Sequence, residues 1–88
     1  MRSLNYSKNF LNNYKRRFSN NIKLRNQIDA RIKLFLQDPT TSILKDHKLT
    51  GAKKHLRAFS ASGDIRVLYY VNGDNVYLVD VGTHNQVY

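Results

Sequence analysis

Two adjacent stretches near the start of the chain place apolar side chains at the spacing of an α-helix. The first stretch covers 7–18 with Ser7 as a suitable N-cap, and its apolar residues are Phe10, Leu11, Tyr14 and Phe18. The second follows a break at 19–21 and stops at Asp38-Pro39, and its apolar residues are Leu24, Ile28, Ile32 and Phe35. Together they predict a helical hairpin joined by a turn of two or three residues.

A different pattern, rich in β-branched and aromatic residues, fills the C-terminal third of the chain. It predicts a meander of three strands, at 56–60, 65–71 and 76–81. A short leading strand is expected at 2–6, and 40–55 is expected to be a loop with a short extended piece. The order βααβββ predicts one α+β domain over 1–88, with the two-helix hairpin packed on one face of a small, twisted, antiparallel sheet.

The last hairpin of this meander has a preferred register. A three-residue loop pairs Val71 with Asn75 and carries Arg66 opposite Asp80, so that apolar residues face apolar ones and the cation faces an acid. A two-residue turn would put Arg66 opposite an apolar side chain. We therefore expect the longer loop, and we expect Arg66 either to pair with Asp80 or to face a phosphate, because an unpaired buried charge is costly.

Charge divides the chain into two unlike parts. The 88 residues carry 15 lysines and arginines against six acidic residues, all of them aspartates, for a net charge of +9. Residues 1–57 hold 14 of the basic side chains and three aspartates, whereas 58–88 hold one arginine and three aspartates. A basic surface of this kind attracts polyanions or acidic proteins, so we expect a nucleic acid or the ribosome as a partner.

The composition also excludes several classes of protein. The chain has no cysteine and no apolar run long enough to cross a bilayer, so neither disulfides nor membrane spanning is expected. The N-terminus shows no secretory signal, which favours a cytoplasmic location. No P-loop, dinucleotide-binding glycine pattern or Ser/His/Asp triad motif occurs, and no structural metal is expected.

The remaining reactive groups are imidazoles, phenols and cations, and these suit the cleavage of RNA. Scission through the ribose 2′-OH needs a base, an acid for the leaving 5′-oxygen and cations for the charge at phosphorus, but no metal or cofactor. His84 follows the last predicted strand, where binding groups tend to sit, while His47 and His55 lie in a basic loop typical of solvated residues. Tyr88 has no packing pattern and is a candidate for stacking on a base. The basic candidates for binding substrate are Lys48, Lys53, Lys54 and Arg57.

Four segments, in this order, resemble the RelE/YafQ family of bacterial toxins. They are KDHKLTG at 45–51, LR at 56–57, DIRVL at 64–68 and LVDVGTHNQVY at 78–88. The resemblance implies a small α+β toxin of a type II toxin–antitoxin module that cleaves mRNA in the ribosomal A site. It also implies a cognate acidic antitoxin that wraps the basic surface or displaces the C-terminal segment.

The resemblance implies roles for individual residues. His84 matches a general-acid histidine of YafQ-like members, and His47 matches a loop histidine that is a candidate base. Arg66 matches the strand arginine that RelE uses at the scissile phosphate, Asp64 resembles an acidic residue of YafQ-like sites, and Tyr88 matches an aromatic that supports the substrate base. In addition, Arg57 matches a strand lysine of RelE.

Two positions depart from this pattern. Phe59 is aligned with a second active-site histidine of YafQ-like members, and Asp80 replaces an arginine found in some of them. Both changes leave fewer groups to stabilise phosphoryl charge. They favour an alternative hypothesis, a ParE-like toxin that inhibits DNA gyrase by binding and needs no catalytic histidine.

Overall fold

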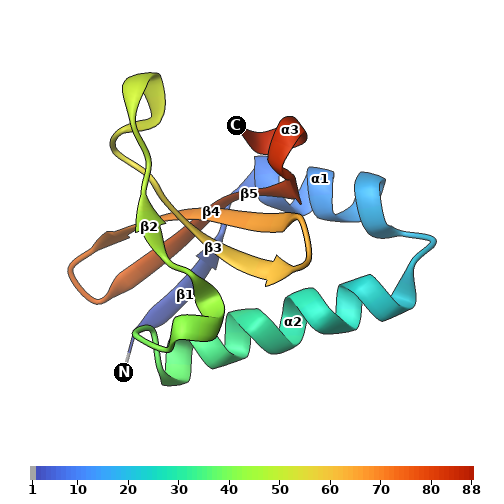
Figure 1. Ribbon diagram of the computed structural model, residues 1–88, viewed down its shortest axis with the longest axis horizontal. Coiled ribbons are helices and arrows are strands. Elements are labelled where there is room, and N and C mark those ends of the chain that lie inside the picture. The colour runs from blue at the N-terminus through green and yellow to red at the C-terminus, as the bar shows by residue number, and fades with distance from the viewer. Residues whose placement is uncertain (1) are drawn as a thin grey trace.

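Two helices lie against one face of a five-stranded sheet, and a third, short helix lies on the other face (Figure 1). The computed structural model describes residues 2–88. Its elements are β1 (Ser3–Tyr6), α1 (Lys8–Phe18), α2 (Ile22–Gln37), β2 (His47–Lys48), β3 (Arg57–Ser62), β4 (Ile65–Asn72), β5 (Asn75–Thr83) and α3 (His84–Val87), with 3₁₀ turns at Ser42–Leu44 and Gly51–Lys53. None of the helices in this part of the chain is long and apolar enough to cross a membrane.

The first helix begins where the sequence predicts, because Ser7 caps it. The Ser7 hydroxyl accepts a hydrogen bond from the backbone N–H of Phe10 at 3.0 Å and donates one to the carbonyl of Val79 on β5 at 3.0 Å. The second helix starts two residues before the predicted apolar run, because the side chain of Asn21 caps it through the N–H of Leu24. Figure 1 shows α1 and α2 diverging from their short connection, so each helix covers its own part of the sheet.

The sheet is mixed, and the expected all-antiparallel arrangement is wrong. Its strand order is β1-β5-β4-β3-β2, and β1 runs parallel to β5, with Leu4 beside Val76. These two strands are far apart in the sequence, because both long helices and three strands lie between them. No tight turn therefore forces them to be antiparallel. The short extended piece expected within 40–55 is β2, which pairs His47 with Ala58 at the other edge of the sheet.

The expected register of the last hairpin is also wrong. The strands close through the two-residue turn 73–74, so that Asn72 pairs with Asn75 and Val71 with Val76. Gly73 occupies the left-handed region at φ 62°, a conformation that short hairpin turns require. Farther along, an irregularity at Leu68/Tyr69 shifts the pairing by one residue.

Because of the two-residue turn and this shift together, Arg66 pairs across the sheet with Gly82 and not with Asp80. The carboxylate of Asp80 instead accepts hydrogen bonds from α1, at 2.8 Å from Asn13 Nδ2 and at 3.4 Å from Arg17 Nη1. The prediction of an Arg66–Asp80 pair is therefore wrong. Asp80 holds α1 to the sheet, and Arg66 lies on the opposite face.

Both faces of the sheet are buried against apolar side chains. The main core lies between the sheet and the two long helices, where Phe35 stacks on Phe59 at 4.8 Å between ring centroids and meets Tyr69 edge-on at 4.6 Å. A smaller group on the opposite face, the Val87 cluster, consists of Leu49, Leu56, Ala58, Leu68 and Val87, with Val79 packed against it. Alternation along β3 and β4 produces this division, since neighbouring residues point to opposite faces.

The double role of Ser7 leads to a test of the fold. Replacing Ser7 by alanine removes both the helix cap and the link to β5, so we expect the free energy of unfolding to fall by about 1 kcal/mol and Tm by about 4–8 °C. Ser19 is a matched control, because it lies exposed at the other end of α1 and its contact with Arg25 uses only the backbone carbonyl. Thermal unfolding that is equal for Ser7→Ala and Ser19→Ala would contradict the role of Ser7.

Candidate active site

The face of the sheet opposite α1 and α2 is called here the site face. It carries α3, which positions His84, and it also carries His47. The α3 helix starts directly after β5 because Thr83 and Gln86 form a capping box, with Gln86 Oε1 accepting from the Thr83 N–H at 2.8 Å. This single turn places His84 and Tyr88 four residues apart on one side of the helix. Their rings meet edge-to-face at 4.3 Å between centroids.

His47, the first residue of β2, reaches the same tyrosine. Its Nε2 lies 3.3 Å from the hydroxyl of Tyr88, and the two rings are nearly perpendicular at 6.3 Å between centroids. Its Nδ1 lies 3.0 Å from the carbonyl oxygen of Lys45. A carbonyl oxygen only accepts hydrogen bonds, so Nδ1 must carry the proton and, in the neutral ring, Nε2 must be the acceptor. His47 therefore presents a free lone pair on Nε2 to the Tyr88 hydroxyl, which is the form that a general base requires.

The backbone of Lys45 is responsible for this arrangement. Lys45 adopts φ 50° and ψ 39°, which makes it the one non-glycine residue with positive φ between residues 2 and 88. This left-handed residue ends the 3₁₀ turn Ser42–Leu44 and aims its carbonyl at the imidazole. Such a conformation is costly for a lysine, and strained residues of this kind cluster at functional sites.

The next residue, Asp46, attaches the loop to the main core. Its Oδ2 accepts a hydrogen bond from the hydroxyl of Tyr69 at 2.5 Å, and its Oδ1 accepts one from Arg57 Nε at 3.2 Å. Tyr69 is only 2% exposed, and burial, followed by the hydrogen bond to Asp46, raises its pKa. The tyrosine therefore stays neutral and remains a donor. Arg57, expected to bind substrate, is engaged with this carboxylate at the edge of the site.

Arg66 completes the cluster from β4. Its Nη1 donates to the carbonyl of Gly63 at 2.8 Å and to the hydroxyl of Ser60 at 3.3 Å. Burial raises the pKa of Tyr88, and Arg66 opposes that rise through its positive charge and by hydrogen bonding to the phenol. The guanidinium thus lies beside Tyr88. Three segments, β2, β4 and α3 with its C-cap, bring together His47, Arg66, His84 and Tyr88, called here the His–Tyr cluster.

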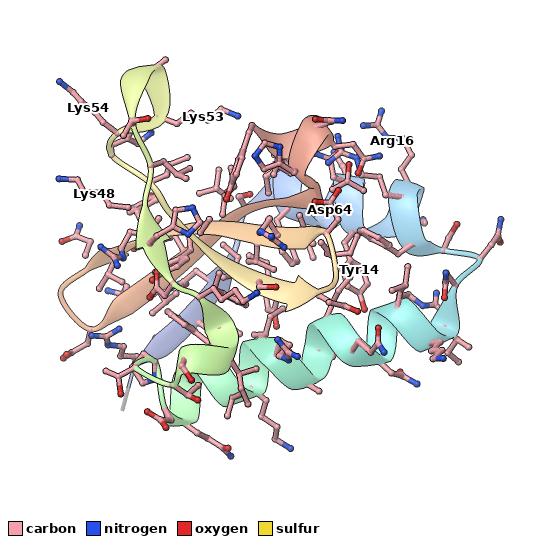
Figure 2. All side chains as sticks on the ribbon, viewed as in Figure 1. Tyr14, Arg16, Lys48, Lys53, Lys54 and Asp64 are labelled. Carbon is pink, nitrogen blue, oxygen red and sulfur yellow. The ribbon has the colours of Figure 1, made fainter. Side chains whose placement is uncertain are left out.

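A cleft of about 470 Å³ opens next to the cluster, between the loop 48–56 and the C-terminus. It is lined by His47, Lys48, Leu49, Thr50, Ala52, Lys53 and Tyr88. Lys53 Nζ donates to the carbonyl of Val87, which ties the loop to α3. Figure 2 shows Lys53 pointing toward α3, whereas Lys48 and Lys54 point away from it. Both Lys48 and Lys53 line the cleft, and Lys54 does not.

Two other polar candidates lie apart from the cluster. Asp64 is exposed in the β3–β4 turn, labelled in Figure 2, and its side chain forms no hydrogen bond or ion pair with another residue of 2–88. The turn nevertheless lies beside the start of α3, because Ile65 pairs with Thr83. His55 is exposed on the far side of the loop. Within the described part of the chain, no group of three His, Cys, Asp or Glu side chains could hold a metal ion.

Phe59, which the resemblance aligns with an active-site position, does not face the cluster. Phe59 is fully buried against Phe35 in the main core, on the helix side of the sheet. The residue that faces the cluster from this part of β3 is Ser60, which is 8% exposed and accepts the hydrogen bond from Arg66. Sequence reasoning missed Ser60, although the alternation of Ala58 and Ser60 with larger residues is the signal that could have identified it.

Comparison with solved structures finds the same fold in several bacterial toxins. YafQ from E. coli strain BL21(DE3) superposes with a TM-score of 0.84 at 21% identity, covering 100% of this chain and 99% of that one. A metal-bound toxin from Helicobacter pylori gives a TM-score of 0.78 at 24% identity, with 100% of both chains covered. YafQ in the E. coli DinJ–YafQ complex gives a TM-score of 0.82 at 21% identity, covering 100% of this chain and 99% of that one. Comparison with curated protein sequences gave no match.

The family itself is shown by a sequence model. The model of the bacterial toxin of the type II toxin–antitoxin system, YafQ, matches residues 2–88. The fold and this match define a small type II toxin. The chain belongs to the YafQ family, as the motifs at 45–51 and 78–88 predict.

The tautomer of His47 gives a test of the site geometry. Lys45→Gly keeps the left-handed backbone, so the neutral ring should retain its proton on Nδ1, as nitrogen chemical shifts report. Lys45→Val disfavours that backbone, so we expect the carbonyl to turn away and the Nε2–H tautomer to gain population. Thermal unfolding verifies that both variants are folded. An unchanged tautomer in Lys45→Val, or a lost one in Lys45→Gly, would contradict the role of the Lys45 carbonyl.

Proposed function

We propose that this toxin is a metal-independent endoribonuclease that cleaves mRNA in the ribosomal A site. The observation that carries the proposal is the placement of two imidazoles against one tyrosine, with an arginine beside them. Two imidazoles supply the base and the acid of an RNA transesterification, and the arginine supplies the cation. The reaction uses only the 2′-OH of the substrate and these side chains.

In the proposed reaction, His47 acts as the base and His84 as the acid. His47 Nε2 takes the proton of the 2′-OH, which replaces the Tyr88 hydroxyl as the hydrogen-bond donor to that nitrogen. The 2′-oxygen attacks phosphorus, a 2′,3′-cyclic phosphate forms, and the bond to the 5′-oxygen breaks. His84 donates the proton that this leaving oxygen needs. Arg66 stabilises the additional negative charge on the phosphoryl oxygens.

The remaining candidates act around this centre. The ring of Tyr88, once its hydroxyl is displaced, supports the base next to the scissile bond. Lys48 and Lys53 border the cleft and attract the flanking phosphates. Asp64 adds negative charge to the turn beside the start of α3. Arg57 acts indirectly, because its pairing with Asp46 orients the loop that carries His47.

The partners follow from the charge of the helices. Their basic residues are Lys8, Lys15, Arg16, Arg17, Lys23, Arg25, Arg31 and Lys33. The four arginines among them also form hydrogen bonds within the protein, and the exposed lysines supply a surface for ribosomal RNA. The E. coli relative assembles with DinJ, which supports a cognate antitoxin here, and the net charge of +9 favours an acidic one. Action on ribosomes places the protein in the cytoplasm, without a membrane partner.

Single-turnover cleavage of mRNA on programmed ribosomes tests the proposal. The wild-type rate should have a bell-shaped pH dependence, because the base must be neutral and the acid protonated. We expect His84→Gln to lower the rate by about 10²–10⁴-fold and to flatten the alkaline limb, and His47→Gln to do the same to the acidic limb. His55→Gln is the matched control for the loss of a histidine outside the cluster, because His55 is exposed, and it should keep both limbs of the pH profile.

Two results would contradict the proposal. One is retention of at least half of the wild-type rate by a folded His84→Gln protein. The other is inhibition of gyrase supercoiling by the purified toxin without any cut in ribosome-bound mRNA, which would support the ParE-like alternative instead. A folded double variant, His47→Gln with His84→Gln, should relieve growth arrest if RNA cleavage causes the toxicity.

A further inference from the structure

A second pocket lies on the other side of the loop 48–56 from the active-site cleft. Its volume is about 300 Å³, and it is lined by Lys48, Lys54, His55, Leu56, Arg57, Tyr70 and Val71. All the ionisable groups in this lining, apart from the phenol of Tyr70, are basic. The proposed reaction uses neither Tyr70 nor Lys54. It therefore does not explain why these two residues lie at the same pocket.

Tyr70 provides an ordered aromatic surface at this pocket. It is 38% exposed on β4, and its ring stacks on that of Tyr77 across the β4–β5 pair, with centroids 4.8 Å apart and planes 16° from parallel. Stacking on a neighbour in a paired strand restricts the ring before any ligand arrives, which lowers the entropic cost of binding. Tyr70 follows the buried Tyr69 and points to the opposite face, so the main core does not account for it.

Cations at the pocket complement this aromatic surface. Lys48 and Lys54 form no salt bridge with any acid in residues 2–88, and Figure 2 shows both side chains pointing away from α3. Arg57 is different, because its guanidinium is paired with Asp46 and carries less of the binding charge. Lys48 also borders the active-site cleft, so it connects the two pockets across the loop.

We propose that the Tyr70 pocket binds a second nucleotide of the same single-stranded RNA, separated from the scissile bond by the loop 48–56. Its base stacks on Tyr70, and Lys48 and Lys54 hold the adjoining phosphates. Single-stranded RNA is recognised by this combination of exposed aromatic rings and separated cations. An acidic peptide would need the cations but gains nothing from the stacked tyrosine pair. The inference rests on the proposed function for the identity of the ligand.

Binding of RNA of two lengths tests the inference. The probes are fluorescent 2′-O-methyl oligouridines of three and of eight nucleotides, which the full-length toxin cannot cleave. The octamer reaches both pockets, so Tyr70→Ala should weaken its binding about tenfold while leaving the trimer unchanged. Tyr70→Phe keeps the ring and should bind like the wild type. Lys54→Ala should reduce the slope of log affinity against log salt concentration by about one for the octamer alone.

Tyr6→Ala is the matched control, because Tyr6 is 46% exposed on β1, at the far edge of the sheet, and should leave octamer binding unchanged. Equal octamer affinity for Tyr70→Ala and wild type would overturn the inference, and so would equal affinity of the wild type for trimer and octamer. Weaker binding of polyglutamate to Tyr70→Ala, with RNA binding unchanged, would assign the pocket to an acidic peptide and also overturn it. Cleavage on ribosomes, measured in parallel, shows separately whether the proposed function fails.

Discussion

The site depends on the burial of one small side chain, Val87, on the site face of the sheet. Val87 is fully buried although it is the penultimate residue, and it packs with Leu49 and Leu56 from the loop against Ala58 and Leu68 of the strands. Burial of this apolar group favours docking of α3, which is only one turn long and would not be stable alone. The same contacts hold the loop. The two segments that carry the histidines therefore share one apolar anchor.

The Val87 cluster sets where the histidines lie, and the hydrogen bonds around Asp46 set how one of them is oriented. Tyr69 belongs to the main core, so its bond to Asp46 transmits the rigidity of the helix side to the loop on the site face. From there, the left-handed Lys45 selects the proton position on His47. The candidate site, assembled from a loop and from α3, is thus supported by both faces of the sheet.

Periodicity in the sequence predicted the helices and the last three strands, because each buries a regular apolar face. It did not predict the direction of β1, since four residues at a sheet edge carry no directional pattern. It did not predict the register of β4 and β5 either, because that register depends on the length of the turn and on a local irregularity. For the site, motifs named His47, Arg66, His84 and Tyr88, which the fold brings together. The role of the Lys45 carbonyl could not be predicted from the sequence, because a lysine in the left-handed conformation has the same residue type as any other lysine.

The most direct test of this account is amide hydrogen exchange in Val87→Ala. Removing two methyl groups from the shared anchor should accelerate exchange in 84–88 and in 47–56 together, while β4 and β5 keep their protection. The rate of mRNA cleavage on ribosomes should fall in the same variant. The account would be contradicted if α3 alone became mobile while the loop stayed protected, or if neither segment changed, because the two histidines would then be held by independent contacts.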